Sequence, residues 1–356
     1  MAAPTIAQLK AAIGAGDHAA CRALIAAEPA LARDWRAIME AALFVDIELL
    51  ALLLAAGADP NAVSPAESRH RPLHRAIETK ASVKPRGDRA AAVTLLLDAG
   101  ADIDAPGCWY DGRPLETAAR CAEAAIAELL LDRGSRPDIF AATLLQDPER
   151  LERELTRNAA LAGEPSASGA GALHLLCASR LSRQNTLALA ERLLESGARA
   201  DAVAIMRHGQ FPVIHFACWS GAADPAVLAL LVSRGASPAD GLYEALWSGD
   251  FAGAGALVGL GASPDGWSHV GKRPLLHDMI QWGRNGAALW LLERGADPNA
   301  PDLNGWTALH YAASRGAKGA LSNALSAAGA DPTLRNRDGQ TPDAVGKARK
   351  VARAGA

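Results

Sequence analysis

Short leucine-rich runs recur along the chain, and most are followed by a glycine, an alanine and a small polar residue. Leu52–Leu54, Leu95–Leu97 and Leu129–Leu131 are examples of these runs. Because glycine readily adopts the left-handed conformation that ends a helix, each run predicts the last turns of a helix and then a turn. The landmark glycines are Gly57, Gly100, Gly134, Gly197, Gly235, Gly261, Gly295 and Gly329, and the last three are 34 residues apart.

A second landmark, a Pro-Leu-His block or a close variant, lies about 20 residues before the first. Proline in the first turn of a helix sacrifices no needed hydrogen bond, so the block predicts where another helix begins. Each unit then contains two helices, and units must stack because one pair cannot bury its apolar face alone. The copies are Arg71–His74, Arg113–Glu116, Ala172–His174, Phe211–His215, Arg273–His277, Thr307–His310 and, in part, Thr341–Ala344.

The Pro-Leu-His blocks, leucine runs and closing Gly-Ala-Asp turns together resemble the ankyrin repeat family, whose period is about 33 residues. The segment from Thr307 to Asp331 follows that pattern most closely, and the resemblance covers nearly the whole chain. It implies an all-α solenoid of about ten helix-turn-helix repeats with short β-hairpin fingers. Composition agrees, because half of the residues are hydrophobic, only 4% are aromatic, and alanine and leucine favour helices over strands.

We expect a single ankyrin-repeat solenoid over residues 1–356, with an N-terminal capping repeat at 1–34, repeats over 35–332 and a C-terminal cap at 333–356. The first, second, fifth and eighth units are short and are expected to lack a full finger. Insertions at 80–89 and 180–186 are interpreted as tolerated surface loops, and the basic residues of the C-terminal cap as a solvated face. The units are 5–34, 35–63, 64–104, 105–137, 138–163, 164–201, 202–238, 239–264, 265–298 and 299–332.

Charge and cysteine usage narrow the class of partner and compartment. Lys and Arg number 36 against 39 Asp and Glu, a net charge of -3, which gives no general electrostatic footprint for nucleic acid or a membrane surface. The longest apolar stretch, residues 49–58, is too short to span a bilayer. Five scattered cysteines without a Cys-x-x-Cys pair indicate a reducing compartment rather than disulfides or zinc. We therefore expect a cytoplasmic location.

The histidines of the Pro-Leu-His blocks are the first candidates for chemistry. Neighbours would lie one repeat apart, on the order of 10 Å, too far to share one metal ion. We interpret them as structural residues that hydrogen-bond to the backbone, which is also the role that the family resemblance implies. Cys177 and Cys218 follow two of these histidines at helical spacing and are interpreted as small core residues. No catalytic residue, metal site or cofactor is predicted.

The tryptophans are the candidates for partner binding. Trp219, Trp247 and Trp282 are expected at the exposed ends of three inner helices, facing the concave groove, which the family uses to contact partners. Trp267 and Trp306 fall in the fingers, and Trp290 is expected in the core. Exposed tryptophans are enriched at binding hot spots. The alternative is that these rings pack against one another as ordinary structure.

The predicted function is a non-catalytic protein–protein interaction module, a monomer that binds a partner through its concave groove. Glu244 and Asp278 precede two of the rings by about one helical turn. Since indole faces attract cations and carboxylates strengthen that attraction, we expect an extended partner segment bearing Lys or Arg. The alternatives are a receptor for a small molecule or a cationic peptide tail in the same groove, and an enzyme built on the solenoid.

Overall fold

The chain forms two compact units of stacked helix pairs, Met1–Phe211 and Pro212–Ala356. The computed structural model describes residues 3–65, 69–78, 83–108, 112–136, 138–166, 168–181, 184–206, 209–219, 221–268, 271–317 and 319–354. The expected ten helix pairs are present in these residues, followed by a single C-terminal helix. The all-α repeat prediction is therefore confirmed.

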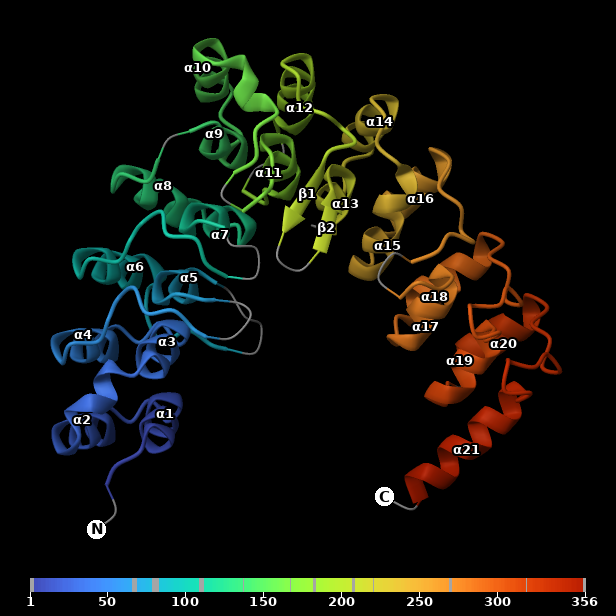
Figure 1. The fold of residues 1–356 in the computed structure, drawn as a ribbon, viewed down its shortest axis with the longest axis horizontal. Helices are drawn as coiled ribbons and strands as arrows, with labels where there is room; N and C mark the ends of the chain where they lie inside the picture. The colour runs from blue at the N-terminus through green and yellow to red at the C-terminus, as the bar shows by residue number, and fades with distance from the viewer. Residues whose placement is uncertain are drawn as a thin grey trace. The chain divides into compact units, whose positions relative to one another are not determined.

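In the first unit the odd-numbered helices contact one another in sequence order and form one layer, and the even-numbered helices form the other (Figure 1). This arrangement follows from the two short helices of each repeat, which bury their apolar faces only when the repeats stack. The helices are α1 (Ile6–Ala15), α2 (His18–Ala27), α3 (Trp35–Leu43), α4 (Ile47–Ala55), α5 (Pro72–Ile77), α6 (Arg89–Asp98), α7 (Pro114–Arg120), α8 (Ala124–Asp132), α9 (Ile139–Leu145), α10 (Pro148–Arg157), α11 (Ala172–Ala178) and α12 (Thr186–Glu195), with 3-10 turns η1 (Pro29–Arg33) and η2 (Ala159–Ala162).

In the second unit the inner layer consists of α13, α15, α17, α19 and α21, each in contact with the next. Among the described residues the final helix, α21, has no outer partner, and it packs on α19. The helices are α13 (Val213–Trp219), α14 (Pro225–Ser233), α15 (Pro238–Ser248), α16 (Phe251–Gly259), α17 (Leu275–Gln281), α18 (Asn285–Glu293), α19 (Ala308–Arg315), α20 (Ala320–Ala327) and α21 (Pro342–Ala354).

The two landmarks have the structural roles that the sequence predicts. Helices α5, α7 and α21 each begin at the proline of their block. The landmark glycines are left-handed, with φ of 89° at Gly57 and 82° at Gly329. The leucine four residues before each glycine is fully buried, so the same spacing both ends the outer helix and fills the core. These leucines are Leu53, Leu96, Leu130, Leu193, Leu231, Leu257, Leu291 and Leu325.

Fingers are short and are absent from some repeats. The two-stranded hairpin of β1 (Val203–Met206) and β2 (Gly209–Pro212) is the longest in the described part of the chain. Three other fingers are reduced to single bridges, Gly107–Gly112, Pro165–Gly171 and Trp267–Pro274. Helix α9 begins five residues after Gly134 and α15 begins three residues after Gly235. The fifth and eighth units therefore have no room for a finger, as predicted.

The first insertion is not the free surface loop that the sequence suggested. Its described residues, 83–88, pack back onto the first two helix pairs. The Arg86 amide donates to the Phe44 carbonyl at 2.8 Å, and its guanidinium donates to the Ile13 carbonyl at 2.7 Å. The same guanidinium lies over the Phe44 ring, 4.3 Å from its centre. Residues 79–82, and residues 182–183 of the second insertion, lie outside the described residues. The first insertion is thus a clasp that joins three repeats.

Candidate partner-binding surface in residues 212–356

Three tryptophans lie at equivalent ends of successive inner helices. Trp219 is the last residue of α13, Trp247 lies in the last turn of α15, and Trp282 caps the C-terminus of α17. Because α13, α15 and α17 are neighbours in the stack, these residues form one row, which we call the tryptophan row. The rings of Trp247 and Trp282 meet edge to face, with their centres 6.1 Å apart.

The three rings differ in how much of each faces solvent. Trp282 is 54% exposed and presents most of its ring. Trp247 is half-buried between the Tyr243 ring, stacked at 5.9 Å, and the Arg284 guanidinium, 4.4 Å from its centre. Trp219 is half-buried against Phe216, with ring centres 5.9 Å apart. Packing within the unit therefore covers part of the rings of Trp219 and Trp247. Trp282 is the ring that a partner can reach most easily.

The finger tryptophans also differ from each other. Trp267, bridged to Pro274 across its finger, is 51% exposed. Trp306 is half-buried and packs on the Tyr311 ring, with centres 5.2 Å apart. Trp290, expected in the core, is buried at 6% exposure and stacks on Phe251.

The two acidic residues do not stand beside the exposed rings as the sequence argument required. Asp278 is fully buried, and its Oδ1 lies 2.8 Å from Nε of Arg273. Glu244 is 7% exposed, and burial raises the pKa of its carboxyl to about 7. Helical spacing correctly placed both residues one turn from a tryptophan, but both side chains turn into the stack. Neither presents an exposed carboxylate to a cation on a partner.

Arginines, which sequence reasoning did not single out, occupy the same edge of the stack. Arg284 covers Trp247. The Arg315 guanidinium lies against Gly283, directly after Trp282, where Nη2 would be 3.6 Å from a β-carbon. The Arg349 guanidinium lies so close over Gly316 that a β-carbon there would collide with it. Each of the three reaches back to the end of the preceding inner helix, and we call them the arginine ladder. Their spacing of 31 and 34 residues was the signal that could have revealed them.

A cleft lies between the inner helices and the finger tips of the last repeats. It encloses about 440 Å³. Arg273, which precedes α17, lines the cleft. Its Nη1 donates to the Tyr311 hydroxyl at 3.2 Å. Polar and charged side chains dominate the lining, which consists of Arg273, Gln281, Asn304, Trp306, Tyr311, Ser314, Arg337 and Asp338. Gln281 immediately precedes Trp282, so the cleft and the tryptophan row adjoin.

Three of the Pro-Leu-His histidines have the structural role that was expected. Nε2 of His74 contacts the Gly112 carbonyl at 2.9 Å, and Nε2 of His310 contacts the Gln340 carbonyl at 2.9 Å. His174 uses both ring nitrogens, because Nδ1 accepts from the Gly171 amide and Nε2 contacts the Ala202 carbonyl. Both ring nitrogens of His174 thus have backbone partners, and Cys177 is buried in the same helix.

The other two histidines differ because of their neighbours. The repeat after His215 lacks a finger, and Nδ1 of His215 lies 3.6 Å from Oε2 of Glu244 instead. His277 is fully buried and stacks on Tyr311, with ring centres 5.1 Å apart. Burial lowers the pKa of His277 to about 4, so its ring is neutral at physiological pH.

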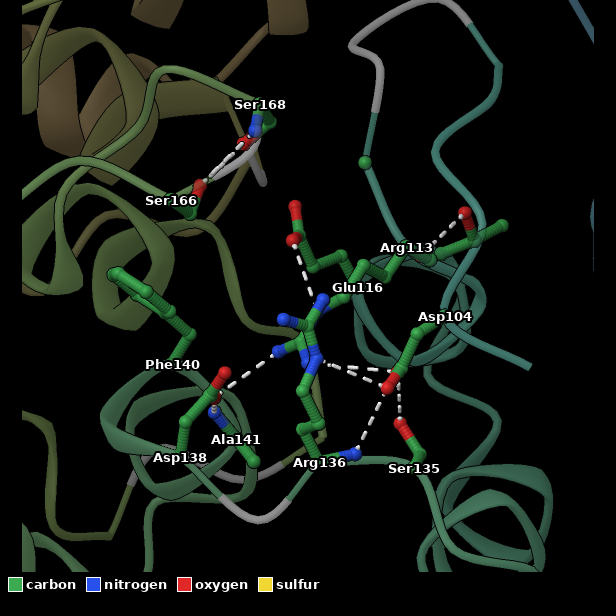
Figure 2. A network of polar contacts seen from close by, with 12 residues as sticks. Asp104, Arg113, Glu116, Ser135, Arg136, Asp138, Phe140, Ala141, Ser166 and Ser168 are labelled. Carbon is green, nitrogen blue, oxygen red and sulfur yellow. Dashed lines mark hydrogen bonds and ion pairs between the residues drawn. The ribbon is translucent and has the colours of Figure 1, made fainter. Parts of the chain in front are cut away.

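A separate cluster of buried charges lies in the first unit. Arg113 is 2% exposed and lies 3.1 Å from Asp138, 3.5 Å from Asp104 and 3.7 Å from Glu116. Figure 2 shows these carboxylates converging on the one guanidinium. The next repeat lacks a finger, and Glu116 occupies the position that histidine has in other blocks. The cluster joins three successive repeats, which favours a structural role.

Other kinds of site find little support in the described residues. Within them, no group of three or more His, Cys, Asp or Glu side chains is arranged to hold a metal ion. Among the same residues, no helix is long and apolar enough to cross a membrane.

Stacked helix pairs with proline-initiated inner helices and glycine-ended outer helices define the class of protein as an α-solenoid. The family model described as ankyrin repeats (many copies) matches residues 276–322, which confirms the ankyrin resemblance in that part of the chain. The chain is also similar to the crystal structure of the ankyrin repeat domain of Bcl-3, a member of the IkappaB protein family. The two are 23% identical with a TM-score of 0.48, over 62% of this chain and 99% of that one. None of the curated proteins matches this sequence.

Proposed function

We propose that the protein is a non-catalytic interaction module that binds a segment of another protein across the tryptophan row and the adjoining cleft. Ankyrin repeats generally serve as protein–protein interaction modules. The observation that carries the proposal is Trp282, which stands 54% exposed at the end of an inner helix and touches Trp247. Large exposed rings in such positions are typical of binding hot spots. The module acts as a monomer in a reducing, cytoplasmic compartment.

The partner is a protein segment rather than a small molecule. Small-molecule sites are usually enclosed and lined mainly by apolar side chains. The cleft is instead lined mainly by polar and charged groups, and the neighbouring ring of Trp282 lies outside its lining. A surface of this kind suits an extended chain that places one apolar side chain on Trp282 and polar groups in the cleft.

A photo-crosslinking experiment tests the proposal. The photoreactive residue benzoylphenylalanine replaces Trp282 in one full-length variant and Ile205 in a control. Ile205 is 74% exposed but belongs to the hairpin of the first unit. We expect a discrete protein adduct in native cells only from position 282. Binding of the captured partner should then weaken at least tenfold on Trp282→Ala, with no change in melting temperature. Adducts of equal yield at both positions, or affinity unaffected by Trp282→Ala, would refute the proposed surface.

A further inference from the structure

We propose that the segment bound at this surface is acidic, with carboxylates spaced to meet the arginine ladder. The inference rests on the proposed function and adds the chemistry of the partner. It reverses the sequence-based expectation of a segment bearing Lys or Arg. Three observations support it: the burial of the local carboxylates, the occupancy of the Trp247 face, and the lack of carboxylate partners for the ladder arginines among the described residues.

Neither carboxylate beside the tryptophan row is exposed, and the exposed Asp338 belongs to the lining of the adjoining cleft instead. Asp278 is fully buried beside Arg273, and Glu244 is 7% exposed. A buried carboxylate that already has a cation at 2.8 Å gains little from a second cation outside. One aromatic face that could bind a cation is also occupied, because the Arg284 guanidinium lies over the Trp247 ring. A lysine or arginine from a partner would have to displace Arg284 from this face of Trp247 and would meet its repulsion.

The ladder arginines are available to anions. Within the described residues, Arg284, Arg315 and Arg349 have no carboxylate within ion-pair distance, whereas Arg273, Arg294 and Lys347 of the same unit each have one. Arg337, at the rim of the cleft, likewise has no carboxylate partner in that part of the chain. An unpaired guanidinium offers a fork of N–H donors that matches a carboxylate in geometry.

The geometry also predicts the spacing of the acidic residues. Adjacent inner helices lie about 10 Å apart, so the ladder cations recur at about that interval. A partner segment in the extended polyproline II conformation advances about 3.1 Å per residue and points every third side chain to the same side. Acidic side chains at every third position would therefore meet successive arginines, with the residues between them free to place an apolar group against Trp282.

The charge balance favours a peptide over a nucleic acid. Residues 212–356 contain 13 Lys and Arg and 12 Asp and Glu, so the unit as a whole is nearly neutral. Proteins that bind nucleic acid without a recognition motif usually depend on a broad basic surface. A narrow ladder beside an exposed indole instead matches a short segment that mixes acidic and apolar residues.

Selection from a displayed library of random 12-residue peptides tests the inference with the full-length protein. We expect enriched peptides to carry Asp or Glu at intervals of three residues, with at least one Leu, Phe or Trp between them. The triple variant Arg284→Gln/Arg315→Gln/Arg349→Gln should bind the best peptide at least tenfold more weakly. A matched variant, Arg199→Gln/Arg234→Gln/Arg294→Gln, removes the same charge beside the outer helices and should bind it normally.

The outcomes separate this inference from the proposed function. Basic or neutral peptides whose binding is lost on Trp282→Ala would overturn the acidic segment and leave the binding surface standing. Peptides that bind equally well to Trp282→Ala, or no enrichment at all, would overturn the proposed function itself. A fluorescein-labelled 20-nucleotide single strand of DNA is tested in parallel. Tighter, ladder-dependent binding of that strand than of the best peptide would also overturn the acidic-peptide inference.

Discussion

The guanidinium of Arg284 lies over the face of Trp247, with its Cζ 4.4 Å from the ring centre. The two residues belong to successive repeats, since Trp247 lies in the last turn of α15 and Arg284 follows α17. This contact joins neighbouring inner helices and also occupies an aromatic face. A cation that the sequence argument assigned to a partner is therefore supplied by the chain itself.

Replacing Arg284 by Gln should expose the Trp247 ring. An exposed cation–π contact is worth about 0.5–1 kcal/mol, so we expect a stability loss of that size. Acrylamide quenching of tryptophan fluorescence should increase in the variant. The control Arg234→Gln, at the end of outer helix α14, should change neither quantity. If quenching is unchanged in Arg284→Gln, the contact does not shield Trp247 in solution.

Much of the fold could be predicted because it depends on local rules that repeat. A leucine four residues before a glycine specifies both a buried position and a helix end, and this holds in the eight repeats that carry a landmark glycine. Proline at α5 and α7 marks the helix start for the same local reason. These features need no knowledge of neighbouring repeats.

The binding surface could be predicted only in part, because side-chain direction depends on those neighbours. The positions of Trp219, Trp247 and Trp282 at helix ends followed from their spacing together with the ankyrin resemblance. Asp278 lies in the first turn of α17, and the sequence did not show that Arg273 would draw it inward. The clasp formed by Arg86 was missed for a similar reason, since its partners Ile13 and Phe44 lie in other repeats.

The stability of the second unit should depend on pH through Glu244. Burial raises the pKa of its carboxyl to about 7 from an ordinary value of 4.5. The folded state therefore keeps a proton that the unfolded state releases, and the free energy of unfolding falls as pH rises from about 4.5 to about 7. Replacing Glu244 by Gln removes this loss. Relative to the wild type, we expect the variant to gain about 2–3 kcal/mol between pH 4.5 and pH 8.

Urea unfolding at several pH values measures that difference. Glu293→Gln is the matched control, because Glu293 is 73% exposed on outer helix α18. Its difference from the wild type should stay constant with pH. A Glu244→Gln difference that is equally flat would show that this carboxyl titrates normally in the folded protein.

Arg113 should be among the most sensitive positions of the first unit. Replacing it by Met leaves Glu116, which is 4% exposed, and two further carboxylates without their common cation. Removing one partner of a buried ion cluster typically costs about 3–5 kcal/mol. Arg133→Met breaks a surface pair with Asp98 and should cost about 0–1 kcal/mol. The double variant Arg113→Met/Glu116→Leu should recover part of the lost free energy of unfolding, measured by urea unfolding. No recovery would mean that Glu116 is not destabilised by losing Arg113.

The clasp of the first insertion predicts a local effect at the N-terminal repeat. Arg86 joins the third helix pair to the first through the Ile13 carbonyl, and its Nη1 also lies 3.3 Å from Asp46 of the second pair. A contact between non-adjacent repeats is unusual in a solenoid, where each repeat normally contacts only its neighbours. Without Arg86, helices α1 and α2 are held by the second pair alone.

We therefore expect Arg86→Ala to increase opening of α1 and α2 while leaving the rest of the unit unchanged. Hydrogen bonds to a charged group contribute about 1.5–3 kcal/mol each, and exposure to solvent reduces that figure here, so a local loss of about 1–2 kcal/mol is expected. Hydrogen exchange should then be roughly tenfold faster in residues 6–27, because about 1.4 kcal/mol corresponds to a factor of ten, and unaltered in α10 and α12. Lys84→Ala is the control, since Lys84 lies two residues earlier in the same insertion and is exposed. Equal exchange rates in the two variants would mean that the insertion is a tolerated loop after all. Faster exchange throughout the unit would mean that Arg86 supports the whole stack rather than its first repeat.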